Sequence, residues 1–311
     1  MKGGINMRPN HLRPGDTVGI IAPASPPDHE KLEQGIPFLQ SLGLHVKLGR
    51  HVADQYGYLA GTDEARLYDL HEMFADPTVK GIICACGGYG TARIAAQIDY
   101  NLIARNPKVF WGYSDITFLH TAIRQLTGLT TFHGPMVSSD MADEDFAPLS
   151  QHMFQQLFQP SELVYSEEIS PLQVISPGEA AGEIVGGNLT LIISTIGTKV
   201  ELNTRGKLLF IEDVDEEPYR IDSMFNQLRM TGKLDEAAGV IIGDFKNAAP
   251  SKRKSSLTLD QVLDHYFASL NKPVMKGFHI GHCSPHFAIP LGTSAHLSTT
   301  HKSLRITPGV K

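Results

Sequence analysis

The sequence predicts an α/β fold: an N-terminal, mostly parallel sheet flanked by helices, followed by a smaller, strand-rich C-terminal domain of mixed α/β type. Two observations lead to this prediction. Short apolar stretches alternate with helix-like stretches through the first part of the chain, with short connections between them. After Met136 this alternation gives way to acidic turns and then to a glycine-rich half. We therefore expect an N-terminal domain at 1–165, a linker at 166–180 and a C-terminal domain at 181–311.

In the N-terminal half, each predicted strand ends in a loop that leads into a helical segment. Apolar runs predict strands at 17–22, 44–48, 81–85 and 109–111, and amphipathic spacing predicts helices at 28–42, 63–74, 91–98 and 118–126. Pro37 should kink the first helix. In parallel sheets, ligands bind beyond the carboxyl ends of strands. The loop 86–90 and Ser114 both follow such ends, so we expect them to face one another.

The second half follows a less regular pattern. A helix is expected near 146–158 within an otherwise irregular stretch. Further helices are predicted at 189–196, 219–231 and 258–269, strands at 207–212 and 239–243, and short strands within 273–280 and 287–307.

Composition limits the classes of function. The chain has 311 residues, 41% hydrophobic and 19% charged, which indicates a globular protein with a substantial core. Its net charge of -6, without a basic block, argues against a nucleic-acid partner, and no apolar run approaches membrane-spanning length. Residues 1–16 lack the continuous apolar segment of a signal peptide. Three cysteines without framework spacing indicate reduced thiols, so we expect a cytoplasmic protein with a soluble ligand.

The stretch from Lys108 to Thr117 has the pattern of a nucleophile elbow. An apolar strand end, Val109–Trp111, is followed by Gly112 and Tyr113, and Ser114 then precedes a helical segment. Such a turn exposes the hydroxyl of the serine next to N–H groups that can stabilise an oxyanion. The alternative is that Ser114 or Asp115 caps the following helix, because both residue types are preferred caps.

The loop from Cys86 to Gly90 has three glycines between a strand and a helix. Glycines let backbone N–H groups approach an anion closely, but the loop matches neither a dinucleotide fingerprint nor a Walker loop. One interpretation is an ordinary turn between strand and helix. The other is that the loop donates a second oxyanion N–H beside Ser114.

An acidic stretch follows the strand 207–212. Glu212 is the first polar residue after the apolar run, at the carboxyl end of the strand, where a carboxylate can orient a histidine. Asp215, Glu216 and Glu217 precede Pro218 and are interpreted as a solvated helix start.

Three histidines, His279, His282 and His286, are spaced like metal ligands. Neighbouring glycines and a proline oppose the helix that would place such rings on one face, so we expect no metal site. Spacing alone does not select the histidine that serves Ser114. The candidates that stay open are His120, His133, His282 and His286.

Several motifs in this order resemble one known family. They are Gly87-Gly-Tyr-Gly90, Gly112-Tyr-Ser-Asp-Ile-Thr117, Phe132-His-Gly-Pro-Met136, Gly186-Gly-Asn-Leu189, Ile211-Glu-Asp-Val214 with Pro218-Tyr-Arg-Ile221, and Gly281-His282 followed by Pro290-Leu-Gly292. The chain resembles, from about Pro14 to Pro308, the serine LD-carboxypeptidases of bacterial cell-wall recycling and the related microcin-immunity peptidases.

The resemblance implies a metal- and cofactor-independent Ser–His–Glu triad of Ser114, His282 and Glu212. It implies an oxyanion hole from the N–H groups of Asp115 and the Gly87–Gly88 turn, with Asn188 as a substrate-binding residue. The implied enzyme is a cytoplasmic homodimer that removes terminal D-alanine from murein (muramoyl) tetrapeptides, with neither nucleic acid nor membrane as a partner.

Two alternatives remain at this point. One is a microcin-immunity-like peptidase that cleaves a toxic peptide–nucleotide. The other is a non-catalytic binder of an anionic ligand. The chain departs from the family pattern at Cys86, where arginine is common, and at Val185, where tryptophan is common, and both departures concern substrate preference.

Overall fold

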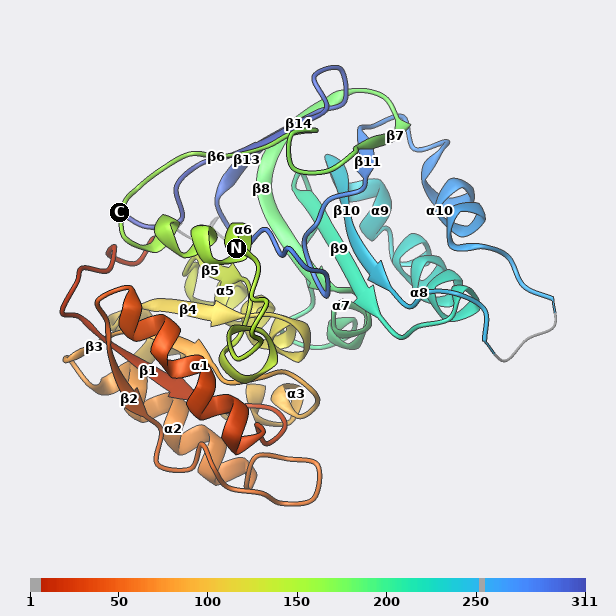
Figure 1. The fold of residues 1–311 in the computed structure, drawn as a ribbon. Coiled ribbons are helices and arrows are strands. Elements are labelled where there is room, and N and C mark those ends of the chain that lie inside the picture. Colours follow the sequence, from red (N-terminus) through yellow and green to blue (C-terminus); the bar gives the residue numbers. More distant parts are fainter. Residues whose placement is uncertain (1–6, 252–254) are drawn as a thin grey trace. The chain divides into compact units, whose positions relative to one another are not determined.

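The computed structural model describes residues 7–251 and 255–311. The first six residues of the stretch 1–16, in which no signal peptide is expected, lie outside the described residues. The chain forms two compact units (Figure 1). The first comprises the chain up to Ser161 together with Ser284–Gly292 and Pro308–Lys311, and the second comprises Glu162–Cys283 and Thr293–Thr307.

The first unit is built on a six-stranded sheet with the order β12-β5-β4-β3-β1-β2. Its strands are β1 (Thr17–Ile21), β2 (His45–Leu48), β3 (Val79–Cys84), β4 (Val109–Gly112), β5 (Thr131–His133) and β12 (Ile289–Leu291). Strands β1 to β5 pair in parallel, and β12 joins β5 in the antiparallel sense. The order 2-1-3-4-5 reverses direction between β1 and β3, and ligands of doubly wound sheets bind at such a point.

Helices connect the parallel strands of this sheet or follow its strand β5. They are α1 (His29–Ser41), α2 (Asp63–Ala75), α3 (Thr91–Ala95), α4 (Tyr100–Arg105), α5 (Thr117–Thr127) and α6 (Pro148–His152), with short helical turns η1 (Ser114–Ile116), η2 (Val137–Met141) and η3 (Met153–Leu157). Thr62 caps α2 by accepting a hydrogen bond from the Ala65 N–H, which confirms the predicted start of that helix. Pro37 lies inside α1 as expected.

The second unit contains an eight-stranded mixed sheet with the order β6-β14-β13-β8-β9-β10-β11-β7. Its strands are β6 (Leu163–Tyr165), β7 (Gln173–Ser176), β8 (Glu179–Asn188), β9 (Leu208–Val214), β10 (Gly239–Lys246), β11 (Val274–Lys276), β13 (Ser294–Ser298) and β14 (Ser303–Ile306). Its helices are α7 (Leu189–Thr195), α8 (Pro218–Met230), α9 (Lys233–Glu236) and α10 (Leu259–Phe267). Strands β8 to β11 are parallel, and the outer strands are antiparallel, so the predicted fold class is confirmed for both units.

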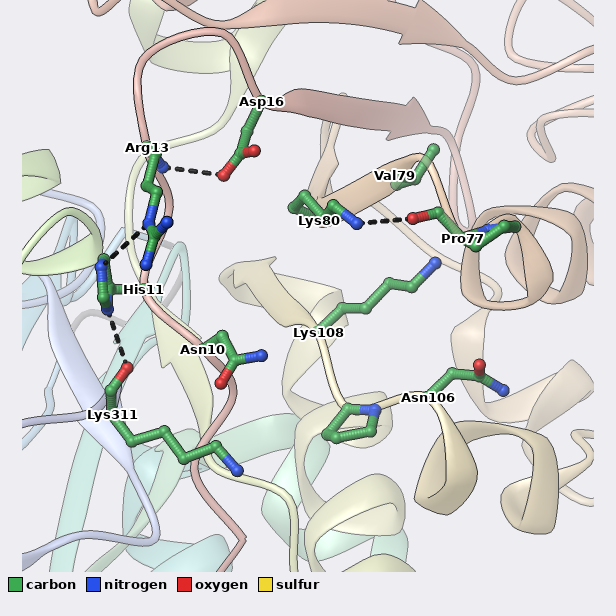
Figure 2. Close-up of a pocket in the computed structure, with 11 residues that line it drawn as sticks. Asn10, His11, Arg13, Asp16, Pro77, Val79, Lys80, Asn106, Lys108 and Lys311 are labelled. Carbon is green, nitrogen blue, oxygen red and sulfur yellow. Dashed lines mark hydrogen bonds between the residues drawn. The ribbon is translucent and has the colours of Figure 1, made fainter.

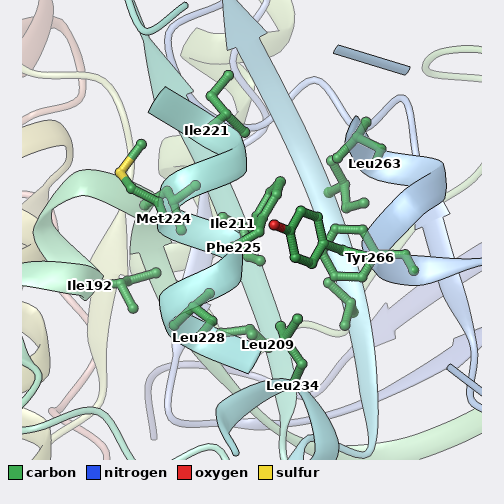
Figure 3. Close-up of a cluster of buried hydrophobic side chains, with 14 of the residues drawn as sticks. Ile192, Leu209, Ile211, Ile221, Met224, Phe225, Leu228, Leu234, Leu263 and Tyr266 are labelled. Atoms are coloured by element: carbon green, nitrogen blue, oxygen red, sulfur yellow. The ribbon is translucent and has the colours of Figure 1, made fainter. Parts of the chain in front are cut away.

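An apolar core fixes the central strands of the second unit (Figure 3). Leu209 and Ile211 of β9 pack with side chains of α8 and α10, where Phe225 contacts the ring of Phe267 at a centroid distance of 5.0 Å. Burial of each such side chain contributes roughly 1.5–3 kcal/mol to folding. The core therefore holds β9, whose last residues include Glu212, in a defined position.

The predicted domain boundaries differ from the observed units. The stretch 166–180, expected as a linker, contains β7 of the second sheet. Residues 284–292 and 308–311, expected in the C-terminal domain, group with the first unit. The reason is strand pairing, since Ile289–Leu291 pair with Thr131–His133, and no local pattern encodes a contact so distant along the chain.

No helix within residues 7–251 and 255–311 combines the length and the apolar character that crossing a membrane would require.

Candidate active site

Ser114 lies at a strained turn in the first unit. It follows β4 and begins η1, and its φ angle is 62°, a left-handed value that is uncommon for residues other than glycine. Such conformations concentrate at functional sites, and a nucleophile elbow holds its serine in this way. Gly112 permits the tight turn, because a Cβ there would lie 3.1 Å from both Cys84 Cβ and Ile116 Cγ1.

The capping alternative does not describe this turn. Helix α5 has Ile116, and neither Ser114 nor Asp115, as its N-cap, and Ile116 makes no side-chain capping hydrogen bond. The carboxylate of Asp115 instead accepts a hydrogen bond from the Thr91 N–H at 2.9 Å. The Thr91 hydroxyl also donates to the Asp115 carbonyl at 2.7 Å. Asp115 thus links the elbow to the start of α3.

The glycine loop faces Ser114, as predicted. A Cβ on Gly87 would lie 2.9 Å from Ser114 Cβ, 3.1 Å from Ser114 Oγ and 3.5 Å from the Asp115 nitrogen. Only glycine leaves room for this approach of the loop to the elbow. The glycine loop and the elbow are therefore in close contact beside the Ser114 hydroxyl.

Ser25, in the loop after β1, holds the glycine loop in place. Its Oγ accepts a hydrogen bond from the Tyr89 N–H at 3.1 Å and donates to the Tyr58 carbonyl at 2.9 Å. Gly88 has a φ of 104°, and a Cβ there would lie 2.3 Å from Ser25 Oγ. Ser25 was not predicted as a site residue, although the loop that contains it also follows the carboxyl end of a strand and could have been recognised from that position.

Arg66 of α2 supports the same two loops from within the protein. Its guanidinium donates to the carbonyls of Pro23 at 2.8 Å and Gly90 at 2.9 Å, and its side chain is fully buried. Hydrogen bonds from a charged donor are stronger than neutral ones. Arg66 therefore ties the loop after β1 to the loop after β3.

Burial shifts the pKa values of two side chains near Ser114. Burial raises the pKa of the Asp115 carboxyl, and the hydrogen bonds from Thr91 partly offset that effect. Burial raises the pKa of the Cys86 thiol to about 12, and Cys86 Sγ donates to the Ser25 carbonyl at 3.2 Å. Cys86 is therefore a neutral thiol at pH 7 and provides none of the positive charge that an arginine would bring.

Glu212 and His282 form a hydrogen-bonded pair in the second unit. His282 Nδ1 lies 2.7 Å from Glu212 Oε2, and the Glu212 side chain is fully buried, while 14% of the His282 side chain is exposed. A carboxylate can only accept at this contact, so Nδ1 carries the proton and Nε2 is the basic nitrogen of a neutral ring. A carboxylate in this position also stabilises the imidazolium that forms after proton uptake.

Two glycines make room for the Glu212 carboxylate. A Cβ on Gly281, where φ is 124°, would lie 2.6 Å from Glu212 Oε2. A Cβ on Gly243 of β10 would lie 3.3 Å from Glu212 Cβ and 2.4 Å from the Ile280 carbonyl oxygen. From the sequence, Gly281 was recognised only as a helix breaker and as part of a motif, and Gly243 was not singled out.

Asn188 and Asp213 form a second polar cluster beside Glu212. Asn188 is the register partner of Glu212 on β8. Its Nδ2 donates to Asp213 Oδ1 at 2.9 Å, and its Oδ1 accepts from the Leu191 N–H, which caps α7. Burial, and then the neighbouring Glu212, raise the pKa of Asp213. Both polar atoms of the Asn188 amide thus have partners within the protein.

The remaining candidate histidines occupy other environments. His120 is buried, its Nε2 donates to the Gly112 carbonyl at 2.8 Å, and burial lowers its pKa to about 4. His133 and His286 lie buried in the first unit with ring centroids 5.4 Å apart, and His286 is 5.0 Å from the ring of Tyr113. Among the described residues, no three His, Cys, Asp or Glu side chains are arranged to hold a metal ion.

The site residues thus fall into two groups. The first unit carries Ser114, Asp115, Gly87 and Gly88, and the second carries Glu212, His282 and Asn188. Val185, where the family commonly has tryptophan, is buried in the apolar core of the second unit.

Comparison with known proteins identifies the family. Residues 18–134 match the model of the LD-carboxypeptidase N-terminal domain, and residues 181–297 match that of the LD-carboxypeptidase C-terminal domain. The probable murein peptide carboxypeptidase of Bacillus subtilis (strain 168) is 58% identical, over 100% of this chain and 98% of that protein. This chain belongs to the LD-carboxypeptidase family.

Solved structures agree with this assignment. The muramoyltetrapeptide carboxypeptidase from Oxalobacter formigenes is 28% identical, with a TM-score of 0.85 over 95% of this chain and 100% of that chain. The MccF-like protein from Bacillus anthracis strain Ames is 28% identical, with a TM-score of 0.86 over 97% and 99%. As an LD-carboxypeptidase, the protein is a hydrolase of the serine peptidase class. The predicted resemblance is confirmed, and the family favours an enzyme over a non-catalytic binder.

Proposed function

We propose that this LD-carboxypeptidase removes the terminal D-alanine from murein tetrapeptides, using Ser114, His282 and Glu212 as its triad. The hydrogen bond between His282 Nδ1 and Glu212 Oε2 is the observation that carries the proposal. It fixes the tautomer that a general base needs. The strained Ser114 turn and the names of two relatives, a murein peptide carboxypeptidase and a muramoyltetrapeptide carboxypeptidase, support the nucleophile and the substrate.

Acylation would use Ser114 and its neighbouring N–H groups together with His282 and Glu212. His282 Nε2 accepts the proton of the Ser114 hydroxyl as Oγ attacks the carbonyl carbon of the scissile bond. The N–H groups of Asp115 and Gly88 donate to the oxyanion of the tetrahedral intermediate. His282 then gives its proton to the leaving amine of D-alanine, and the acyl group stays on Ser114. Glu212 stabilises the imidazolium during both transfers.

Deacylation would repeat these steps with water as the nucleophile. His282 takes a proton from the water as its oxygen bonds to the acyl carbon, and the oxyanion again forms against the same N–H groups. His282 then returns the proton to Ser114 Oγ as the ester bond breaks, and the tetrapeptide shortened by one residue leaves as a free acid. Every proton in this cycle moves through His282. Asn188 would contribute by holding the Asp213 carboxylate beside Glu212, and we retain it as a candidate substrate-binding residue.

A microcin-immunity-like activity is the second candidate. It is favoured by the similarity to the MccF-like protein from Bacillus anthracis strain Ames. The triad would be the same, and the scissile bond would be an amide in a peptide–nucleotide. The two functions differ in the product, which is D-alanine in one case and an aminoacyl nucleotide analogue in the other.

Mass spectrometry of the products separates these functions. The wild-type protein is incubated with a disaccharide tetrapeptide, a free tetrapeptide and a peptidyl sulfamoyl adenosine, in parallel with Ser114→Ala. We expect a mass loss of one alanine from the tetrapeptides, abolished by Ser114→Ala. The matched control is Ser194→Ala, because Ser194 is an exposed serine whose hydroxyl only bonds the Leu191 carbonyl. Wild-type turnover by Ser114→Ala would rule out the proposed mechanism.

Two further parts of the proposal concern the state of the protein. We propose that it acts in the cytoplasm as a homodimer. All three cysteines, Cys84, Cys86 and Cys283, are free thiols, which fits a reducing compartment. Light scattering after size-exclusion chromatography tests the dimer, and fractionation of a native host tests the compartment. A monomer at micromolar concentration, or a secreted protein, would contradict the respective part.

A further inference from the structure

A second pocket lies in the first unit, at the sheet edge opposite to Ser114. The cavity has a volume of about 490 Å³, within the range of small-molecule sites (Figure 2). Its walls come from the amino ends of three strands, since Asp16 precedes β1, Val79 and Lys80 begin β3, and Lys108 precedes β4. Ser114 follows the other end of β4, six residues later and roughly 15–20 Å away along an extended strand.

Positive charge dominates the wall of this pocket. Arg13, Lys80, Lys108 and Lys311 line it, against the single carboxylate of Asp16. The Asp16 carboxylate accepts a hydrogen bond from the backbone N–H of Arg13 at 2.8 Å. Arg13, Lys80 and Lys311 are exposed, and Lys108 is buried in the pocket floor.

The four cations of the pocket wall share one feature. Within residues 7–251 and 255–311, no carboxylate is seen in an ion pair with any of them, in contrast to pairs such as Lys47–Asp76 at 2.7 Å and Lys207–Glu183 at 3.1 Å. The protein carries a net charge of -6, so acidic partners are abundant. Clustering unpaired cations in one concavity is unfavourable unless an anion neutralises them.

Backbone carbonyls orient two of the ammonium groups without neutralising them. Lys108 Nζ donates to the Met73 carbonyl at 2.7 Å, and Lys80 Nζ donates to the Pro77 carbonyl at 2.6 Å. Burial lowers the pKa of Lys108 to about 8, and the charge of Asp76 offsets only part of this effect, so the charged form lacks full compensation. An anion in the pocket would supply that compensation.

His11 fixes the opposite wall. Its Nδ1 lies 3.0 Å from the Lys311 carbonyl oxygen, and its Nε2 lies 3.5 Å from Arg13 Nε. A carbonyl can only accept and a guanidinium can only donate, so both contacts are satisfied by the neutral ring with the proton on Nδ1. His11 thereby connects Arg13 with Lys311 and leaves the donors of the guanidinium fork available to a ligand.

We propose that this pocket binds a small phosphorylated molecule. The planar guanidinium of Arg13 and the ammonium groups of Lys80, Lys108 and Lys311 are donors that match phosphate oxygens. The side-chain amides of Asn10 and Asn106 also line the cavity and offer neutral hydrogen bonds to the rest of the molecule. The site is separate from the peptidase machinery and needs no part of it.

Isothermal titration calorimetry of the full-length protein tests this site. The probes are inorganic phosphate, pyrophosphate, glucose 6-phosphate and ADP in a phosphate-free buffer, with sodium chloride at matched ionic strength as the blank. We expect saturable binding of at least one probe. Inorganic phosphate or pyrophosphate alone would identify free phosphate as the ligand, and tighter binding of an organic phosphate would identify a phosphorylated metabolite.

Variants locate the binding. Lys80→Gln with Lys311→Gln should weaken binding about a hundredfold, because each charge-assisted hydrogen bond to a phosphate is worth roughly a factor of ten or more. The matched control is Lys31→Gln with Lys199→Gln, which removes the same charge from other exposed positions and should leave the affinity within about twofold.

Peptidase activity distinguishes this proposal from the proposed function. Ser114→Ala should bind the probe with wild-type affinity, and the double variant at 80 and 311 should keep wild-type turnover without the probe. Saturable binding that the double variant retains in full, or no saturable binding of any probe, would overturn the proposal. Either result leaves the triad untouched.

Discussion

Replacing Glu212 by glutamine tests the pair on which the proposed mechanism depends. The carboxylate is fully buried, and its Oε2 lies 2.7 Å from His282 Nδ1. Within the described part of the chain, Glu212 Oε1 has no hydrogen-bond partner. If the amide oxygen of glutamine faces His282, the buried NH₂ group lacks an acceptor. If the NH₂ group faces His282, Nδ1 must accept, the proton moves to Nε2, and the general base is lost.

The magnitude follows from the charge that is removed. Two unit charges at the observed 2.7 Å separation attract by about 6 kcal/mol at an effective dielectric constant of about 20. Loss of that stabilisation from the imidazolium in the transition state corresponds to roughly a 10⁴-fold decrease in kcat. The same substitution in a Ser–His–Asp triad has an effect of about that size.

The assay follows release of D-alanine from a murein tetrapeptide by a coupled oxidase, with single-turnover measurements for slow variants. Glu216→Gln is the matched control, since Glu216 precedes α8 and pairs only with exposed Arg220 at 3.4 Å. Thermal unfolding of both variants checks that the fold persists. If Glu212→Gln stays folded and keeps kcat/KM within tenfold of wild type, the assignment of Glu212 is refuted.

Three further substitutions test other features. Gly281→Ala should abolish turnover, because the added Cβ would lie 2.6 Å from Oε2 of the buried Glu212 carboxylate. Gly277→Ala is the control, since Gly277 has a similarly strained φ of 100°, and it should lower only the melting temperature. Similar kinetics for both variants would contradict this prediction. Thr91→Val should destabilise the fold by about 1–3 kcal/mol and slow acylation, because the buried Asp115 carbonyl loses the hydrogen bond from the Thr91 hydroxyl at 2.7 Å. An unchanged free energy of unfolding together with unchanged burst kinetics would contradict this prediction. For Lys108, the folded pKa of about 8 lies below the ordinary 10.5, so the unfolded chain binds more protons between these values. The free energy of unfolding of the wild-type protein should therefore rise by up to about 3 kcal/mol from pH 8 to 10.5. Denaturant titrations of Lys108→Met over the same pH range should show no such rise.

Much of the architecture could be predicted from local patterns. The alternation of apolar strands and amphipathic helices identifies β1 to β4 and α2 and α5 nearly to the residue. The same rule of strand ends predicts that the glycine loop and Ser114 face each other, because both follow parallel neighbouring strands. Glu212 was selected because it ends an apolar strand, and the structure confirms that it bonds a histidine.

Features that depend on distant pairing could not be predicted in this way. The spacing of residues left four histidines as candidates for the catalytic base, and only the family resemblance pointed to His282. The contact between Glu212 and His282 joins residues seventy positions apart, and such a contact produces no periodic pattern in the sequence. The clamp at Ser25 depends on where the loop after β1 meets Gly88. Asn188 was assigned to substrate, but its amide also caps α7 and holds Asp213, a role that depends on the register of β8 with β9.

The position of β12 has a consequence for synthesis of the protein. Residues Ile289–Leu291 supply the edge strand of the sheet that carries Ser114. A nascent chain that has emerged from the ribosome only as far as Cys283 would leave the hydrogen-bonding edge of β5 open. The nucleophile-bearing sheet is therefore completed only when nearly the whole polypeptide has been translated. Truncated products would carry an unprotected edge available for aggregation in place of a finished sheet.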